Sequence, residues 1–227
     1  IDICSDQLAE LIAQRGIDTV VHLAAVVTPP KHGGRELAYR VDVVGTERLL
    51  EACLTHGVRR LVWTSSGAAY GYHADNPPLL DEDQPLRGNE IFAYAHHKRL
   101  VEETLARYRR EHPELSQLVL RPGTIVGAGT SNQITAIFER PLVLGLREAD
   151  SPFVFIWDED VAACIVEGIH GDTQGVFNLA GDGVMTLREI ARALGKPFVA
   201  LPAAWVERGL GLMQRLGVAP YGPEQIC

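Results

Sequence analysis

Tyr94 and Lys98 lie in a segment whose apolar spacing predicts a long helix over residues 92–111. Residues four positions apart share one helix face, so the two side chains are expected to be neighbours. A phenol has a pKa near 10, and an adjacent ammonium lowers it by stabilising the phenolate. Ser66 lies in a small-residue loop after an earlier predicted strand, where its hydroxyl can bind a substrate oxygen. The three side chains predict a metal-free proton-transfer site for interconverting an alcohol and a carbonyl. Tyrosine and lysine at this spacing are also common on solvated helices, so the spacing alone assigns no function.

The elements that would position these side chains alternate regularly along the first half of the chain. Apolar periodicity predicts helices over residues 6–14, 37–55 and 92–111, and β-branched or apolar runs predict strands over residues 19–23, 60–64 and 117–121. Strands that alternate with helices of this length indicate an α/β fold with a doubly wound parallel sheet. The first strand is short and apolar enough to be buried on both faces. Ligands bind such sheets beyond the carboxyl ends of their strands, which are the loops after Leu23, Thr64 and Arg121.

The second half of the chain has a looser pattern and predicts a smaller lobe. Helical stretches are expected over residues 134–138, 161–169, 186–194 and 203–216, with short strands over 153–156 and 176–179. We therefore expect residues 1–130 to form the main domain. Residues 131–227 would form mainly a substrate-binding α/β lobe, with some strands returning to the main sheet.

Composition excludes several classes of protein. The chain has 227 residues, 46% of them hydrophobic, and a formal net charge of -8, which argues against disorder and against a nucleic-acid partner. No apolar run is long enough for a membrane-spanning helix. The four cysteines show no CxxC spacing, so neither a metal site nor a disulfide framework is expected. With no signal-peptide pattern at the start of the sequence, we expect a cytoplasmic location.

A series of motifs, in order along almost the whole chain, resembles the extended short-chain dehydrogenase/reductases, the family that includes NAD-dependent sugar epimerases and dehydratases. Each motif is weak alone, but the ordered set is specific. The matching segments are Asp2-Ile3, Val20 to Ala25 (VVHLAA), Val43 to Thr46 (VVGT) with Leu49 to Ala52 (LLEA), Thr64 to Gly71 (TSSGAAYG), Tyr94 to Lys98 (YAHHK), Arg121-Pro122 with Gly127, Asp160 to Ala162 (DVA), and Val176 to Leu179 (VFNL).

The resemblance implies a Rossmann-type domain and a role for each matching residue. Tyr94 would be the acid–base catalyst, Lys98 would lower its pKa and bind the nicotinamide ribose, and Ser66 would hold the reacting oxygen. The cofactor, NAD or NADP, would contact Asp2, Ile3, Leu23, Ala24, Ala25, Thr64, Tyr94, Lys98, Arg121 and Pro122, and the substrate would contact Ser66, Gly67 and Thr124. The family also implies a homodimer formed through the helices at 37–55 and 92–111.

Departures from the family pattern bear on completeness and on the substrate. The glycine-rich phosphate loop expected on the first strand–helix turn is absent, so we expect these residues to be part of a longer protein. Asp42 stands where the family usually has Asn. Thr124 and Phe153 stand where the family's nucleotide-sugar enzymes often carry an asparagine and an arginine near the diphosphate, and Trp157 replaces a common histidine. A sugar nucleotide is therefore one expected substrate, and a smaller or more apolar carbonyl compound is the alternative.

Two further expectations concern histidines and activity. His96 and His97 flank the motif on other helix faces and are expected to be solvated, whereas His22 at a strand end is expected to be a hydrogen-bonded core residue. The preferred function is an NAD(P)-dependent epimerase, dehydratase or oxidoreductase acting on a small molecule. The alternatives are a simple carbonyl reductase and a non-catalytic relative that only binds the cofactor.

Overall fold

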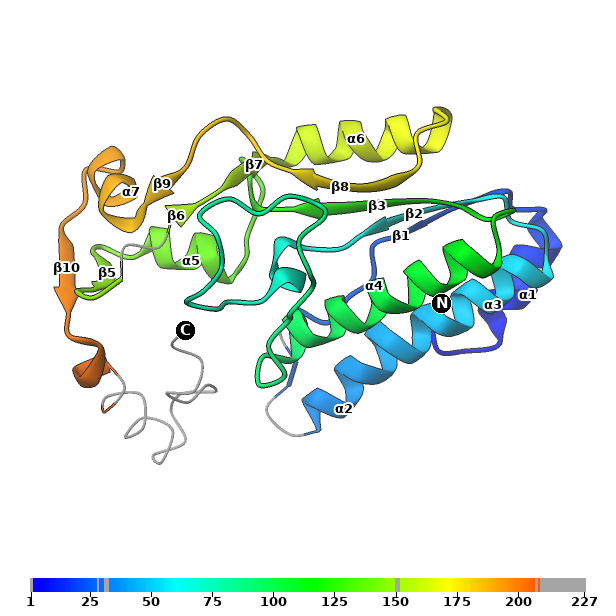
Figure 1. The fold of residues 1–227 in the computed structure, drawn as a ribbon, viewed down its shortest axis with the longest axis horizontal. Helices are drawn as coiled ribbons and strands as arrows, with labels where there is room; N and C mark the ends of the chain where they lie inside the picture. Colours follow the sequence, from blue (N-terminus) through cyan, green and yellow to red (C-terminus); the bar gives the residue numbers. More distant parts are fainter. Residues whose placement is uncertain (1, 28, 31–32, 150–151, 207, 209–227) are drawn as a thin grey trace. The chain divides into compact units, whose positions relative to one another are not determined.

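The structure is a computed structural model that describes residues 2–27, 29–30, 33–149, 152–206 and 208. The chain divides into two units (Figure 1). The first unit contains Ile1–Pro122 and Ala163–Asn178, and the second contains Gly123–Ala162 and Leu179–Cys227. The chain therefore leaves the first unit at the end of one strand and later returns to it.

The first unit is built on a four-stranded sheet with the order β1-β2-β3-β8. The strands are β1 (Thr19–His22), β2 (Arg60–Thr64), β3 (Ser116–Pro122) and β8 (Gly175–Leu179). β1 and β3 both pair in parallel with β2, which places His22 beside Trp63 and Thr64 beside Leu120. The carboxyl ends of these strands consequently meet at one edge of the sheet.

Alternate residues of the central strands are buried on opposite faces of the sheet, as the two-residue period of a strand requires. Leu61, Trp63 and Val119 belong to a core cluster with apolar side chains of α1, α3 and α4. On the other face, Gly168 of α6 comes so close that an added Cβ would lie 2.4 Å from Leu118 and 3.2 Å from Val62. Helices therefore cover both faces, and the predicted doubly wound α/β fold is confirmed (Figure 1).

The helices of the first unit begin and end close to the predicted positions. They are α1 (Gln7–Arg15), α2 (Gly34–Tyr39), α3 (Gly45–Thr55) and α4 (Ala93–Glu111), with α6 (Asp158–His170) entering from the second unit. Gly16 ends α1 in the left-handed conformation, φ 58°, that glycine adopts without steric cost. The single helix expected over 37–55 is interrupted by a π-helical turn, η1 (Arg40–Val44), between α2 and α3.

One prediction about burial was wrong. The strand at 19–23 was expected to be buried on both faces, but Thr19, Val20 and Val21 are only half-buried and His22 alone is buried. The reason is topological, because β1 lies at an edge of the described sheet.

The second unit contains three two-stranded sheets and two short helices. β4 (Thr124–Val126) pairs with β7 (Phe155–Trp157), β5 (Val143–Leu146) with β10 (Phe198–Leu201), and β6 (Pro152–Phe153) with β9 (Met185–Thr186). The helices α5 (Gln133–Glu139) and α7 (Leu187–Ala193) both begin at capping boxes, in which side chain and backbone satisfy each other's hydrogen bonds. Most of the helix predicted over 203–216 lies outside the described residues.

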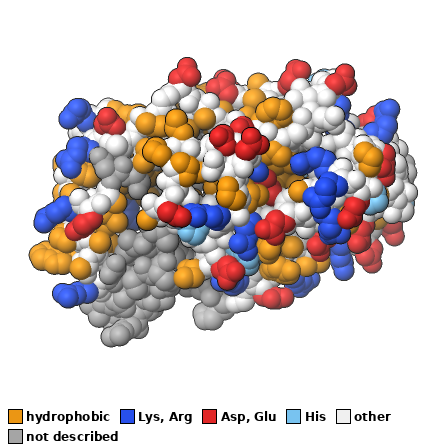
Figure 2. Space-filling view, viewed as in Figure 1, with side chains coloured by type: hydrophobic (Ala, Val, Ile, Leu, Met, Phe, Trp, Pro, Cys, Tyr) orange, Lys and Arg blue, Asp and Glu red, His pale blue; other side chains and the backbone are white. Residues whose placement is uncertain are grey.

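The visible surface carries both signs of charge. Acidic and basic side chains are interspersed with apolar ones over the face drawn in Figure 2. Within the described ranges of the chain, no helix combines the length and apolar character that crossing a bilayer would require.

Candidate active site

Ser66 is held by the backbone just beyond the carboxyl end of β2. It has an extended conformation and caps the 3-10 helix η2 (Gly67–Tyr70), because its Oγ accepts a hydrogen bond from Ala68 N at 3.1 Å. The cap fixes the side-chain rotamer and places the hydroxyl at the strand edge where ligands of such sheets bind.

Lys98 reaches the same place from α4. Its side chain is buried, and Nζ donates a hydrogen bond to the Thr64 carbonyl oxygen at 2.6 Å. Nζ also lies 4.6 Å from the centre of the Trp63 ring and 5.7 Å from that of Tyr94, the residue one turn earlier on α4. The ammonium thus joins the end of β2 to the first turns of α4.

Tyr94 completes the group. The Ser66 hydroxyl lies near enough to the Tyr94 phenol that, by itself, it would lower the pKa of that phenol. The structure therefore brings Ser66, Tyr94 and Lys98 together, as the sequence predicts. The arrangement can hold a proton on one oxygen, with a hydroxyl beside it and a cation nearby.

Burial dominates the electrostatics of this group. It raises the pKa of Tyr94, and the negative charge of Asp42 adds to that rise, so the expected net lowering is not seen. Burial likewise lowers the pKa of Lys98 to about 8, although Asp42 and Glu102 favour its charged form. Both pKa shifts therefore favour the neutral forms of Tyr94 and Lys98.

His22 is the buried, hydrogen-bonded histidine that the sequence predicts. Its Nε2 lies 2.9 Å from Oγ1 of Thr46, which donates to the Asp42 carbonyl oxygen at 2.6 Å. Burial, followed by the charge of Lys98, lowers the pKa of His22 to about 4. The imidazole is therefore neutral near pH 7.

Several residues expected to contact a cofactor lie at the same edge of the sheet. Leu23 is 53% exposed directly after β1, followed by exposed Ala24 and half-buried Ala25. Near the start of the chain, Asp2 is exposed and accepts a hydrogen bond from Cys4 N, while half-buried Ile3 packs beside Gly45.

Arg121 has its guanidinium committed to the protein. Its donors bind the Glu102 carboxylate, the Tyr70 hydroxyl and the Glu82 carbonyl oxygen, and the residue is buried, as is Pro122 after it. Any cofactor contact at Arg121 is therefore left to its backbone. Thr124 lies on β4 in the second unit, where its backbone N–H donates to the Val154 carbonyl oxygen.

The histidines beside the motif differ from the prediction. His96 is half-buried, but His97 is only 2% exposed, so the expectation that both are solvated was wrong for His97. The physical reason is that α4 is covered on two sides, by the sheet and by the α2–η1 segment, whose Asp42 binds the imidazole.

Sequence reasoning missed the buried polar partners of the site. Glu102 could have been found, because it lies four residues after Lys98 on the same helix face. Tyr70 and His97 carry no comparable local signal, since their partners come from distant parts of the chain.

Comparison with known proteins identifies the family of the chain. Residues 1–180 match the model of the NAD dependent epimerase/dehydratase family. An N-acetyl-alpha-D-glucosaminyl-diphospho-ditrans,octacis-undecaprenol 4-epimerase of Escherichia coli O157:H7 is 37% identical over 127 residues, 54% of this chain and 35% of that protein. A 3-diazoavenalumate denitrifying reductase of Streptomyces sp is 31% identical over 189 residues, 76% of this chain and 59% of that protein.

A solved structure supports the fold. The UDP-glucose-4-epimerase of Stenotrophomonas maltophila, with bound NAD and formylated UDP-arabinopyranose, superposes with a TM-score of 0.75 at 22% identity, over 89% of this chain and 69% of that one. The chain spans about half the length of the curated relatives that it matches most extensively. The chain belongs to the NAD dependent epimerase/dehydratase family.

Proposed function

We propose that this chain carries the acid–base site of an NAD-dependent enzyme that interconverts a hydroxyl and a carbonyl carbon of a sugar nucleotide, as an epimerase or dehydratase does. The observation that carries the proposal is the meeting of three side chains at the carboxyl end of β2. Lys98 binds the Thr64 carbonyl there and lies 5.7 Å from the centre of the Tyr94 ring, and Ser66 is near enough to Tyr94 to affect the pKa of its phenol. Family membership supplies the cofactor class.

The chemistry of the residues present fits the nicotinamide half of such a cofactor. Leu23 and Ala24 give an exposed apolar surface immediately after β1, next to the end of β2. The ammonium of Lys98 and the phenol of Tyr94 are suited to bind ribose hydroxyls. When bound, the nicotinamide supplies hydride transfer.

The chain's own residues would manage the proton. Tyr94 Oη takes the proton from the substrate hydroxyl as the carbonyl forms, and returns it when the hydroxyl is restored. Ser66 Oγ donates a hydrogen bond to the same substrate oxygen and so fixes its position. While it is charged, Lys98 would favour the phenolate form of Tyr94 against the opposing effect of burial.

The first test replaces the phenol. Tyr94→Phe should lower kcat on UDP-glucose, UDP-N-acetylglucosamine or a thymidine diphosphate sugar by about 10²- to 10⁴-fold. The Kd for NAD, measured by calorimetry, should change little. Tyr108→Phe is the matched control, because Tyr108 is a buried tyrosine of the same helix that belongs to the apolar core. Full turnover by Tyr94→Phe would refute the acid–base role. Tight NAD binding by a chain that acts on none of these substrates would favour a non-catalytic relative.

One observation favours carbonyl reduction of an apolar compound as a second candidate function. In the second unit, half-buried Phe138, Phe153 and Phe155 form an aromatic cluster with ring centres 5.9 to 6.1 Å apart. Such a surface suits an apolar group better than a diphosphate. Calorimetry with UDP separates the candidates, since a sugar-nucleotide enzyme binds the nucleotide alone and a reductase of this kind does not.

We also propose that the chain forms a homodimer through α2, α3 and α4. The support is a groove of about 360 Å³ lined by side chains of these helices and η1, with both acidic and basic residues that could pair across a twofold axis: Tyr39, Val43, Glu47, Leu100, Glu103, Thr104, Arg107 and Arg110. Leu37 and Tyr39 on the same helices are 44% and 41% exposed. Sedimentation of the wild-type chain and of Leu37→Asp tests it, because a charge placed in the interface should give a monomer.

A further inference from the structure

A buried carboxylate joins three segments that are far apart in the sequence. Asp42 on η1 is 7% exposed, and its Oδ2 accepts a hydrogen bond from His97 Nδ1 on α4 at 3.0 Å. Its Oδ1 accepts a hydrogen bond from the backbone N–H of Val26 at 2.8 Å. Since a carboxylate only accepts, the geometry requires the His97 tautomer that carries its proton on Nδ1.

The link matters most for the segment that follows β1. Among the described residues, the bond from Val26 N–H to Asp42 Oδ1 is the only hydrogen bond that residues 24–27 form. Ala24 and Val27 are exposed, and Ala25 and Val26 are only half-buried, so packing holds this segment only in part. The hydrogen bond to Asp42, which also binds His97, links the segment to α4.

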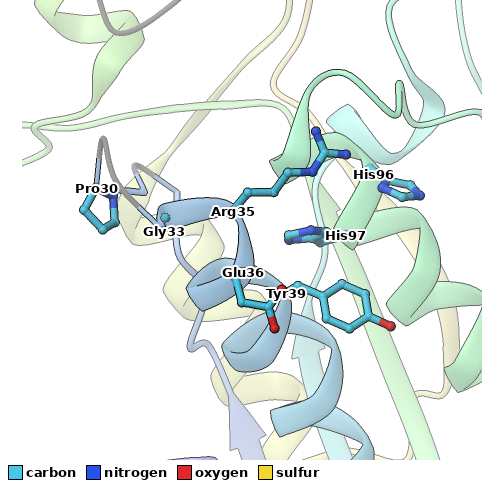
Figure 3. A pocket seen from close by; sticks show the side chains of 8 residues that line it. Pro30, Gly33, Arg35, Glu36, Tyr39, His96 and His97 are labelled. Atoms are coloured by element: carbon cyan, nitrogen blue, oxygen red, sulfur yellow. The ribbon is translucent and has the colours of Figure 1, made fainter.

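The other groups that face His97 come from α2 and from its own helix. The Tyr39 ring meets the imidazole edge-on with centres 5.6 Å apart, and the His96 ring centre is 6.0 Å away. Arg35 and Glu36 line, with these rings, a cavity of about 660 Å³ at the start of α2 and α4 (Figure 3). In that view His97 lies between Arg35 and Tyr39. The His97 imidazole thus binds the Asp42 carboxylate and lies beside the rings of Tyr39 and His96.

We propose that Asp42 and His97 are positioning residues that hold residues 24–26 against α4 and thereby set the distance between the cofactor-binding end of β1 and the pair Tyr94 and Lys98. The inference rests on the proposed function, because only that function gives residues 24–26 a cofactor to position.

The chemistry of the pair supports this role over simple packing. Burying a carboxylate is costly, and apolar side chains of similar size would fill the same space at less cost. Apolar residues, however, cannot form the two directed hydrogen bonds by which Asp42 holds the backbone of Val26 and the side chain of His97 on α4. The charge also acts at the site, since Asp42 raises the pKa of Tyr94 and favours the charged form of Lys98.

Two variants of His97 and one control separate positioning from stability. His97→Leu removes the donor to Asp42, whereas His97→Gln keeps an amide N–H that can donate. Val101→Ala is the control, because Val101 is a buried residue of α4 in the core cluster with no part in the link. We expect His97→Leu to lower kcat about tenfold to a hundredfold and to weaken NAD binding, because small displacements of reacting groups are costly. His97→Gln should restore most of this loss, and Val101→Ala should lower only the melting temperature.

Asp42→Asn tests the charge apart from the geometry. An asparagine can accept from Val26 with its oxygen and donate to His97 Nδ1 with its amide, so both links survive with the proton moved to Nε2. We expect Asp42→Asn to lower kcat less than His97→Leu does, because both hydrogen bonds are kept. The pH profile should move to lower pH, since the charge that raises the pKa of Tyr94 is gone.

Measurements on the cofactor-free chain distinguish a failure of this inference from a failure of the proposed function. Amide hydrogen exchange should show Val26 protected in the wild type and in Val101→Ala, but exposed in His97→Leu. ¹⁵N NMR of labelled histidine should show the Nδ1–H tautomer of His97, and the Nε2–H tautomer in Asp42→Asn. An Nε2–H wild type, or a His97→Leu variant no more impaired in kcat and NAD binding than Val101→Ala, would overturn the positioning role. A wild-type chain with the expected tautomer that binds no NAD would refute the proposed function instead.

Discussion

Arg121 and Glu102 form a buried ion pair that ties α4 to the carboxyl end of β3. Arg121 Nη2 donates to Glu102 Oε2 at 2.6 Å, and Nε lies 2.9 and 3.1 Å from the two carboxylate oxygens. Arg121 Nη1 donates to the Tyr70 hydroxyl oxygen at 2.7 Å, and Ser65 Oγ donates to Glu102 Oε1 at 2.5 Å. Because Glu102 is one helical turn beyond Lys98, the ion pair fixes α4 relative to the loop that carries Ser66.

Breaking this ion pair on one side should be strongly destabilising. Arg121→Met leaves the Glu102 carboxylate buried without its cation, which is expected to cost about 3–5 kcal/mol of the free energy of unfolding. Urea unfolding measures the loss. The double variant Glu102→Leu with Arg121→Met removes both charges and should recover at least half of it. A double variant as unstable as the single one would show that packing at Arg121, and not the unpaired charge, causes the loss.

Lys98 is expected to reduce stability in exchange for activity. Burial lowers its pKa from 10.5 in the unfolded chain to about 8 in the folded one. The folded state therefore disfavours the ammonium below pH 8, and this penalty disappears as pH rises through 8 to 10.5. Lys98→Met should raise the free energy of unfolding at pH 7 by roughly 1–2 kcal/mol, after the lost hydrogen bond to Thr64 is counted, and should abolish turnover.

The pH dependence provides the check on that prediction. Denaturant unfolding of wild type and Lys98→Met at pH 7 and pH 10 should show the stability gap closing at the higher pH. A constant gap would mean that the change in packing, and not the buried charge, stabilises the variant.

The sequence predicts elements that depend on local pattern. The bounds of β2 agree with the prediction, and α4 begins one residue later than expected. The π turn at Arg40–Val44 could not be predicted, because its residues have ordinary helical periodicity. That turn carries Asp42, whose partners Val26 and His97 are brought to it only by the tertiary fold.

The candidate site was predictable to the same extent. Ser66, Tyr94 and Lys98 follow from spacing and from the order of the elements, because parallel strands end at one edge of the sheet. The direction of the pKa shift of Tyr94 was not predictable. It depends on how deeply the phenol is buried, which no local pattern encodes.

His22 should make the fold sensitive to acid. Burial lowers its pKa from 6.5 to about 4, so the unfolded chain binds a proton at His22 over a range in which the folded chain does not. The free energy of unfolding is therefore unaffected by His22 above pH 6.5. It falls by up to about 3 kcal/mol as pH decreases from 6.5 toward 4. His22→Asn should lose less stability than wild type between pH 7 and pH 4.5 when both are unfolded by urea. Parallel curves for the two proteins would exclude His22 as the cause.

Ser66 should tune the working pH of Tyr94. Because the Ser66 hydroxyl lowers the pKa of the phenol, Ser66→Ala should raise that pKa further and move the alkaline rise of kcat to higher pH. The lost hydrogen bond should reduce kcat at pH 7 by about five- to tenfold. Ser66→Thr keeps a hydroxyl that can also cap η2, and so should restore the profile. Ultraviolet titration of the phenolate, with Tyr94→Phe subtracted, measures the same shift without substrate. An unchanged titration in Ser66→Ala would mean that Ser66 acts on the substrate oxygen alone, since its contact with Tyr94 would then carry no free energy.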